Sequence, residues 1–330
     1  MDFYFIKALA KGLLSFIPGA SLLSRREGGG AGSARYCYSV WLRHLVLAHS
    51  HGMRKIPGVV AELGPGDSLG IGIAAMLSGV NKYYAFDVVK FIRFEKNQKI
   101  LDELMDLFRA RAPIPNEQEF PHLFPRLEDY SFPERIIDDG ILAKSLAHNR
   151  ISEIRAALKN TSLACDNASL ITYSVPWNSA SVLCENSIDF ILSQAVLEHV
   201  EELENAYTSM CLWLKPGGYI SHEIDFKSHG TAHVWNGHWC YKDFMWRIIR
   251  GKRAYLLNRE PLSSHIRQLQ SSGFDLKLLS KVHMPIQSPP VRLAPRFAGL
   301  DDDDLTTCSA YLLACKEEQR VGNCHEKSCY

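Results

Sequence analysis

A glycine-rich loop followed by an acidic residue is the feature of this sequence best suited to chemistry. The loop reads Glu62-Leu63-Gly64-Pro65-Gly66-Asp67-Ser68-Leu69-Gly70, and Asp87 comes later, near the end of a second apolar run. Glycines let a ligand approach the backbone closely, and the free N–H groups at the start of a helix attract negative charge. An acid at the end of the next strand can accept both hydroxyls of a ribose. The pattern therefore predicts a site for a nucleoside-containing cofactor.

The loop by itself leaves the cofactor open. NAD(P)-dependent oxidoreductases use a similar loop with an acid about 20 residues further on, and the glycine spacing here imitates its looser form. Three further features bear on the choice. Glu62 precedes the first glycine by two residues, and Pro65 stands between the glycines. Residues 193–200 (Ser-Gln-Ala-Val-Leu-Glu-His-Val) follow the fourth predicted strand, and residues 214–218 (Leu-Lys-Pro-Gly-Gly) lead into the fifth.

In this order and spacing, the motifs resemble those of class I S-adenosylmethionine-dependent methyltransferases of the small-molecule type. The resemblance covers residues 59–89 and 170 to about 279. The surrounding sequence is similar to one uncharacterised bacterial branch of the family, through residues 35–44 and 235–239. The resemblance implies S-adenosyl-L-methionine (SAM) as the cofactor and a sheet whose last strand is antiparallel.

The resemblance also implies roles for individual residues. Glu62, Gly64 and Gly66 would line the methionine and ribose part of SAM, and Asp87 would hold the ribose hydroxyls. Residues 173–175 fall where the family contacts adenine, although the acid usual there is absent. The predicted cofactor-binding residues are Glu62, Gly64, Pro65, Gly66, Asp87, Ser174 and Gln194.

The nature of the acceptor can be narrowed from the same motifs. Enzymes that methylate the amino groups of nucleic-acid bases usually carry Asn/Asp-Pro-Pro-aromatic after the fourth strand, where this chain has Ser-Gln-Ala-Val. The 37 basic and 36 acidic residues leave a formal charge of +1, which also argues against a nucleic-acid partner. We therefore predict O-methylation of a small molecule, with a saccharide or glycan precursor as the leading candidate. An NAD(P)-dependent oxidoreductase and a non-catalytic binding module on the same fold are the alternatives.

Methylation of an alcohol needs a general base, and histidine is the commonest choice. Four histidines fall within seventeen residues, at positions 222, 229, 233 and 238. We predict His222 or His229 as the base, with Asp225 orienting or assisting it near the end of the fifth strand. The alternative is that these side chains only form hydrogen bonds in the pocket. No metal is predicted, because Gly230 argues against the helix that a His229–His233 ligand pair would need.

The residues after the fifth strand are aromatic and basic. Trp235, Trp239 and Trp246 could stack on a sugar ring or belong to the core of a lid. Between residues 241 and 267 there are seven basic side chains and two acidic ones. Such a run is usually a solvated helix face, and beside a cofactor cleft it can bind a phosphate or carboxylate. The sequence therefore leaves two interpretations open: a solvated helix face, or a site for an anionic or sugar-containing acceptor.

The elements that position these residues alternate between strands and helices, which predicts a mostly parallel sheet covered on both faces. Strands are expected at residues 59–63, 83–89, 170–175, 188–193, 219–224, 276–282 and 309–314. Helices are expected at residues 68–77, 96–110, 136–159, 195–214 and 265–271. Together with the family resemblance, which implies the antiparallel last strand, the expected fold class is α/β: a Rossmann-like, doubly wound, mostly parallel seven-stranded sheet with an antiparallel last strand and a helical insertion.

The chain is expected to form one methyltransferase domain with additions. Residues 1–58 are predicted to form N-terminal helices and a linker, at residues 24–33, that pack on the core. Residues 59–330 form the methyltransferase domain, with a helical insertion at about 91–168 and a substrate-side region at about 222–261. The helix expected up to Phe16 is amphipathic, and it packs on the domain or associates weakly with a membrane.

Composition sets the remaining expectations. The chain of 330 residues is 46% hydrophobic and 22% charged, as in ordinary globular proteins. Its nine cysteines contain no Cys-x-x-Cys pair, which argues against a disulfide framework and for a reducing, cytoplasmic setting. No apolar run reaches the ~20 residues of a membrane span.

Overall fold

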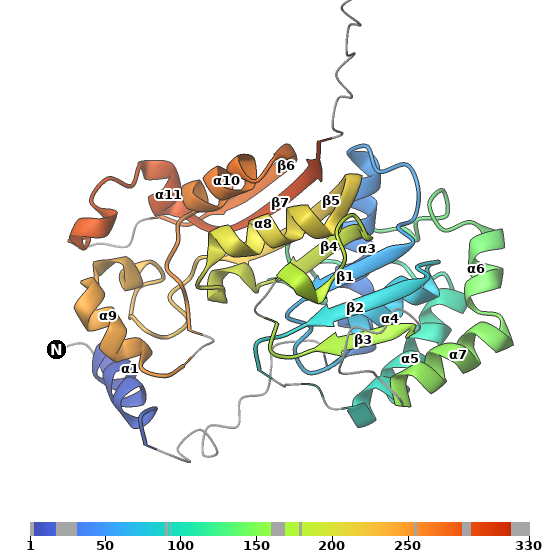
Figure 1. Cartoon of the computed structure of the whole chain (residues 1–330), viewed down its shortest axis with the longest axis horizontal. Helices are drawn as coiled ribbons and strands as arrows, with labels where there is room; N and C mark the ends of the chain where they lie inside the picture. The colour runs from blue at the N-terminus through green and yellow to red at the C-terminus, as the bar shows by residue number, and fades with distance from the viewer. Residues whose placement is uncertain are drawn as a thin grey trace, which may run out of the picture.

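Seven strands form one sheet at the centre of the molecule (Figure 1). The structure, a computed structural model, describes residues 3–17, 32–89, 92, 94–159, 169–177, 180–253, 256–285 and 292–317. The strands are β1 (Val59–Leu63), β2 (Lys82–Phe86), β3 (Ile171–Ser174), β4 (Ile188–Gln194), β5 (Leu214–Asp225), β6 (Phe274–His283) and β7 (Thr307–Lys316). Their order across the sheet is β3-β2-β1-β4-β5-β7-β6.

The pairing of the strands confirms the predicted fold class. The pairs β1–β2, β2–β3, β1–β4 and β4–β5 are parallel, and β7 is antiparallel to both β5 and β6. Because β1 lies between β2 and β4, the chain winds outward from β1 in both directions. In such sheets ligands bind beyond the carboxyl ends of the strands, where the winding reverses. The loops after β1 and β4 therefore define where a cofactor site is expected.

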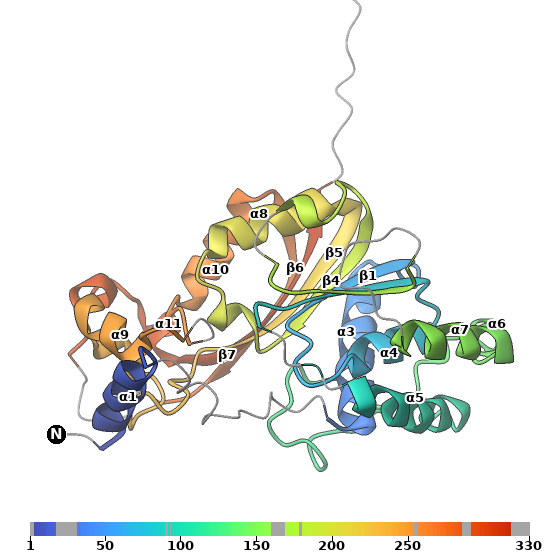
Figure 2. The same ribbon diagram turned by 60° about the horizontal axis from the view of Figure 1, so that its bottom comes forward.

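Helices cover both faces of the sheet (Figure 2). One face carries α3 (Ala34–Ser50), α4 (Gly70–Leu77) and α5 (Phe94–Arg109), with α6 (Asp139–Ser145) and α7 (His148–Lys159) beyond them. The other face carries α8 (Leu203–Trp213) and α10 (Leu262–Ser271). Alternating strand residues supply the two cores: Tyr83 and Ala85 of β2 pack with the α3–α4 layer, whereas Tyr84 and Phe86 pack on the opposite side.

Two helices far apart in sequence pair at one end of the molecule, away from α5–α7 (Figure 1). These two helices are α1 (Phe3–Leu14) and α9 (Asp243–Arg250). A separate short helix, α11 (Asp302–Thr306), lies between β6 and β7. Helices α1 and α9 approach so closely that a Cβ on Gly12 would collide with the Ile248 carbonyl oxygen. The N-terminal helix thus rests on the substrate-side region.

The structure differs from several of the predicted elements. β5 begins at Leu214, five residues before the expected start, and β2 ends at Phe86 instead of residue 89. The helix expected at residues 195–214 begins only at Leu203, because Ala195 has a φ of +54° and Leu197–His199 forms a 3₁₀ turn, η2. The helix expected at residues 136–159 is divided into α6 and α7. Most of the predicted linker at 24–33 lies outside the described residues, as do residues 160–168 at the end of the insertion.

Candidate active site

The glycine loop after β1 adopts a conformation that requires glycine. Gly64 has a φ of +66° and Gly66 a φ of +71°, in the left-handed region. A Cβ on Gly64 would lie 2.5 Å from Cγ2 of Val196, in the loop after β4. The Gly64 amide donates to the Phe86 carbonyl oxygen at 2.7 Å, and Pro65 is buried. The loop is thereby held tightly between the carboxyl ends of β2 and β4.

Asp87, directly after β2, is a buried carboxylate with an unused oxygen. Its side chain is 5% exposed, and Oδ1 accepts the Val88 amide at 2.8 Å. Oδ2 has no hydrogen-bond partner among the described residues. Burial raises the pKa of Asp87 to about 7. Since a buried polar atom without a partner is costly, a ligand hydroxyl that donates to Oδ2 would stabilise this arrangement. The group fits the ribose of a nucleoside cofactor.

Two other predicted cofactor residues, Glu62 and Ser174, lie next to the glycine loop and Asp87. Glu62 is buried in β1 and accepts a 2.5 Å hydrogen bond from the Tyr83 hydroxyl. Burial raises the pKa of Glu62 to about 8, so the carboxyl is largely protonated at neutral pH. Ser174 ends β3, where its carbonyl oxygen accepts the Asp87 amide at 3.1 Å. The structure thus brings Glu62, Gly64, Pro65, Gly66, Asp87 and Ser174 to one edge of the sheet.

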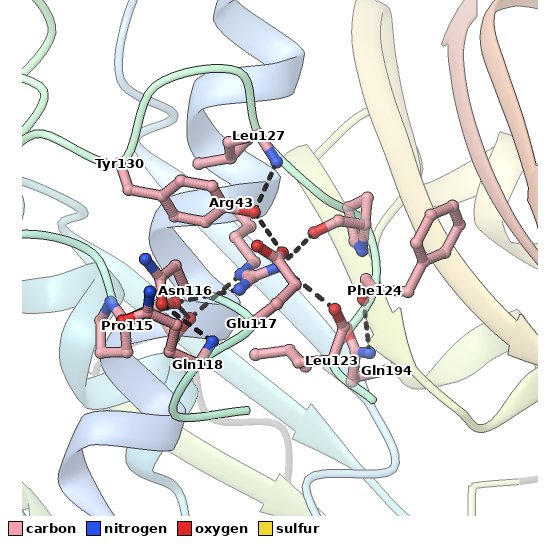
Figure 3. Close-up of polar contacts among 12 residues, drawn as sticks. Arg43, Pro115, Asn116, Glu117, Gln118, Leu123, Phe124, Leu127, Tyr130 and Gln194 are labelled. Atoms are coloured by element: carbon pink, nitrogen blue, oxygen red, sulfur yellow. Dashed lines mark hydrogen bonds and ion pairs between the residues drawn. The ribbon is translucent and has the colours of Figure 1, made fainter. Parts of the chain in front are cut away.

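Gln194, the last residue of β4, connects three parts of the chain. Its Nε2 donates to the Phe124 carbonyl oxygen at 2.9 Å (Figure 3). Its Oε1 lies 3.0 Å from Nε2 of His44. Because Oε1 can only accept, His44 Nε2 must carry the proton and Nδ1 must accept from the Ser221 hydroxyl at 2.6 Å. Burial lowers the pKa of His44 to about 4, so this histidine is neutral.

Phe124 belongs to a segment that we name the strap, residues 112–130, which α3 holds in place. Arg43 is fully buried in α3 and donates to three strap carbonyl oxygens (Figure 3). These are Pro115 at 2.9 Å, Leu123 at 3.2 Å and Pro125 at 2.6 Å. The strap therefore reaches from α3 to the carboxyl end of β4. The signal for this anchor in the sequence is an arginine, Arg43, between the apolar residues 40–42 and 45–48 of the helix, and the sequence analysis gave it no role.

At the carboxyl end of β5, a histidine and a carboxylate form a half-buried pair. His229 Nε2 lies 3.3 Å from Asp225 Oδ2, and Lys227 Nζ lies 2.9 Å from Oδ1. Burial opposes the ionisation of Asp225, but the His229 hydrogen bond and the Lys227 charge outweigh it and hold the pKa of Asp225 well below its usual range. The His199 ring is 5.3 Å from that of His229. This pair can accept a proton at its histidine.

His222 is placed differently from Asp225 and His229. Alternation along β5 turns it toward the α8–α10 layer, where its ring is fully buried beside Tyr207. Its Nδ1 lies 2.7 Å from the Ser193 hydroxyl. Burial lowers its pKa to about 3. Of the two predicted bases, only His229 reaches the partly exposed end of β5.

Two buried carboxyl groups near this pair were missed by the sequence analysis. Glu198, in η2, is 3% exposed, and neither carboxyl oxygen accepts a well-aligned hydrogen bond from a described residue. His199 Nε2 lies 3.9 Å from Oε1. Burial and the nearby Glu223 raise its pKa well above the usual value. Burial likewise raises the pKa of Glu223 to about 7, while Ser309 donates to it at 2.6 Å. Glu223 lies two residues before Asp225 on β5, so strand alternation could have marked it as a neighbour, whereas nothing local in the sequence places Glu198 beside them.

A hollow of about 410 Å³ lies beside α9, within the predicted substrate-side region. Its walls include the side chains of Trp246, Arg247, Arg250, Asn258, Arg259 and Arg296. Asn258 Nδ2 donates to the Leu197 and Val200 carbonyl oxygens at 2.8 and 2.7 Å, which connects the hollow to η2. A larger hollow, of about 1560 Å³, opens at the opposite edge of the sheet, beside Gly58 and Gly218, and is remote from Asp87 and His229.

No group of three or more His, Cys, Asp or Glu side chains in the described ranges is arranged to hold a metal ion. Among the helices that the structure describes, none has both the length and the apolar character needed to cross a bilayer.

Comparison with known proteins gives one family and several distant structures. Residues 141–221 match the family described as "Methyltransferase domain". Phosphoethanolamine N-methyltransferase 2 of Haemonchus contortus, solved with SAM, is 13% identical at a TM-score of 0.41; the match covers 84% of this chain and 53% of that one. This chain thus spans about half the length of that protein.

Two further solved structures are similar to the chain to the same degree. A SAM-dependent methyltransferase of Methanosarcina mazei is 11% identical at a TM-score of 0.42, with 83% and 98% of the two chains covered. A putative sarcosine dimethylglycine methyltransferase of Galdieria sulphuraria is 13% identical at 0.40, with 85% of each covered. No curated protein sequence matches.

Proposed function

We propose that this chain, which has the class I methyltransferase fold and a segment of the methyltransferase-domain family, is a SAM-dependent methyltransferase of a small molecule. The observation that carries the proposal is the buried, unpartnered Oδ2 of Asp87, next to a loop whose two glycines have positive φ. When bound, SAM supplies a methyl group carried on a sulfonium. The family match favours this function over the nicotinamide-dependent alternative.

The residues around the loop would hold the cofactor in separate ways. Asp87 would accept hydrogen bonds from the ribose, and the left-handed turns at Gly64 and Gly66 would let the cofactor approach the backbone. Glu62 and Tyr83, buried beneath, support the loop through their hydrogen bond. Gln194, at the carboxyl end of β4, would face the junction between cofactor and acceptor while the strap holds its amide.

The Asp225–His229 pair supports an oxygen acceptor. If Nε2 of His229 donates to the ionised Asp225, its Nδ1 is left to accept the proton of an acceptor hydroxyl. Asp225 would keep the imidazole in this tautomer and stabilise the imidazolium that forms. This is the base proposed in place of the buried His222. The saccharide or glycan precursor remains our candidate for the hydroxyl compound.

The arginine-lined hollow beside α9 supports an anionic group on the acceptor. Four arginines surround it together with three carboxylates, those of Glu201, Asp243 and Glu260. Arg247 makes no ion pair with any described residue, so the hollow retains a cation that can bind a phosphate or carboxylate. Trp246 adds an aromatic surface on which a sugar could stack.

Calorimetric titration of the protein with SAM and with NAD(P) tests the function. We expect saturable binding of SAM, weakened at least about tenfold in Asp87→Asn because one acceptor of the ribose hydroxyls is lost. Asp106→Asn, on the exposed face of α5, is the matched control. Binding of NAD(P) alone would overturn the proposal. SAM binding without methylation of any compound in a broad sugar and metabolite panel would instead favour a non-catalytic module.

A further inference from the structure

The outward face of α1 is apolar although it lies on the surface. Its inner face packs on α9 through Ala8, Gly12 and their neighbours. On the outer side, Phe3 is 70% exposed and Leu13 is 55% exposed. The other large apolar side chains exposed along this helix and the turn after it are Ile6, Leu14, Phe16 and Ile17. A helix that is apolar on two sides is expected to be covered on both.

The exposed apolar residues of α1 lie along one side of the helix, and the neighbouring α9 adds a further exposed aromatic residue. Phe3, Ile6 and Leu13 recur at helical spacing, and Phe16 and Ile17 extend the stripe. Phe244, in the first turn of α9, is 71% exposed. Single exposed apolar residues are ordinary, but a contiguous set of this size marks a contact surface. We call this set, with the cations beside it, the α1 surface.

The charged residues of α1 itself are positive. No acidic residue occurs between Phe3 and Ile17, whereas Lys7 and Lys11 lie on α1. Lys7 Nζ lies 6.0 Å from the Phe3 ring centroid, and Lys252 Nζ lies 5.6 Å from that of Phe16. The acid of the first turn of α9, Asp243, is paired with Arg259 at 2.6 Å.

We propose that the α1 surface lies on an anionic lipid bilayer. Aromatic and aliphatic side chains flanked by lysines are the composition of helices that insert their apolar face at the level of the headgroups. Anionic headgroups complement Lys7, Lys11 and Lys252. A second copy of the chain on the same surface would instead bring like charges together. The inference goes beyond the proposed function and does not depend on methyl transfer.

Vesicle co-sedimentation of the full chain tests the proposal. We expect the protein to sediment with vesicles of phosphatidylcholine mixed with phosphatidylglycerol, and much less with pure phosphatidylcholine. Added salt should reduce the binding because the electrostatic part is screened. No binding to the anionic vesicles at low salt, or equal binding to both kinds, would overturn the proposal.

Matched variants assign the binding to the α1 surface. Leu13→Ser with Leu14→Ser, and separately Lys7→Glu with Lys11→Glu, should each lower partitioning by roughly tenfold or more. Leu212→Ser with Val282→Ser, which changes exposed apolar residues elsewhere, should leave it unchanged. The same melting temperature and SAM affinity in all variants would show that each is folded. Undiminished partitioning of the Leu13/Leu14 variant, or a dimer in light scattering that this variant abolishes, would contradict the proposal.

Discussion

At the scale of single residues, the proposed methyl transfer to a hydroxyl depends on which histidine the acceptor can reach. His222 and His229 are seven residues apart, yet the first is enclosed between the sheet and α8 whereas the second pairs with Asp225 near the surface. A base must be reachable by the acceptor and must lose its proton again to solvent. Because His222 is fully buried, neither the acceptor nor solvent can reach its ring. The pairing with a carboxylate that stays ionised gives His229 a fixed orientation.

Replacing His229 tests this assignment. We expect His229→Asn to lower kcat by ~10²-fold or more, because no group is left to take the hydroxyl proton. Asparagine is chosen because residue 229 has a φ of +46°, which Asn tolerates better than most residues. SAM affinity, measured by calorimetry, should be unchanged. Unaltered turnover of an acceptor found in the metabolite panel would remove His229 from this role.

His222 supplies the contrasting variant. His222→Gln should destabilise the fold by about 1–3 kcal/mol, because the buried Ser193 hydroxyl then meets a partner of different shape. Turnover per folded molecule should stay within about threefold of the unaltered protein, well short of the loss expected of a missing base. Urea denaturation and kinetics at a temperature where both proteins are folded give the two numbers. A drop in kcat as large as that of His229→Asn would return the base to His222.

At the scale of elements, the loops at the carboxyl ends of the strands determine the site. The loop after β1 touches the loop after β4 where Gly64 meets Val196, so the two must form together. We expect Gly64→Ala to weaken SAM binding at least about tenfold and to lower the free energy of unfolding by about 1–3 kcal/mol, because both the positive φ and the contact with Val196 oppose a Cβ.

Gly299 is the control for that substitution. A Cβ at this position would meet nothing within 4 Å, so Gly299→Ala should leave SAM affinity unchanged. Calorimetry and chemical denaturation measure both variants. Wild-type affinity in Gly64→Ala would contradict the placement of the cofactor at this loop.

The strap is the second element whose role can be tested. Arg43→Met should cost about 3–5 kcal/mol of stability, because three buried strap carbonyl oxygens lose their donor. Arg35→Met, on the same helix, removes only an exposed ion pair with Glu119 and should cost less than about 1 kcal/mol. Denaturation curves measure the difference. Equal costs would show that the strap does not depend on Arg43.

The sequence could predict the elements that depend on neighbouring residues, but not those that depend on contacts between residues far apart in the chain. Buried parallel strands are continuous apolar runs, so β1 and β4 lie where they were expected. The loop and Asp87 were predictable because their motif is local. The start of α8 was not, since the apolar Val196 packs on Gly64 across the sheet edge instead of continuing a helix. The contacts of Gln194 with His44 and the strap join residues 70 to 150 positions apart, and no local pattern encodes them.

At the scale of the whole molecule, buried titratable groups of two kinds set the response to pH. Burial raises the pKa of Asp87 and Glu223 to about 7 and of Glu62 to about 8. These carboxyls bind protons more tightly in the folded chain than in the unfolded chain. Their contribution to the free energy of unfolding is therefore complete below their unfolded pKa, near 4, and is lost as pH rises through 7–8. Burial has the opposite effect on the pKa of four histidines, which it lowers: His44 to about 4, and His222, His238 and His265 to about 3.

Those histidines bind protons more tightly in the unfolded chain, so their contribution is complete above about pH 6.5 and falls as pH drops toward 3–4. Between pH 4.5 and 6.5, the stability lost by the carboxyls as pH rises is offset by the stability gained from the histidines. Above pH 6.5 only the carboxyls still change the free energy of unfolding. We expect the free energy of unfolding, from urea denaturation without cofactor, to fall by roughly 2–3 kcal/mol between pH 6.5 and 8. Asp87→Asn, which removes one of these carboxyls without changing its shape, should flatten that slope. A free energy of unfolding that does not fall over this interval would mean that the buried carboxyls are already ionised in the folded protein.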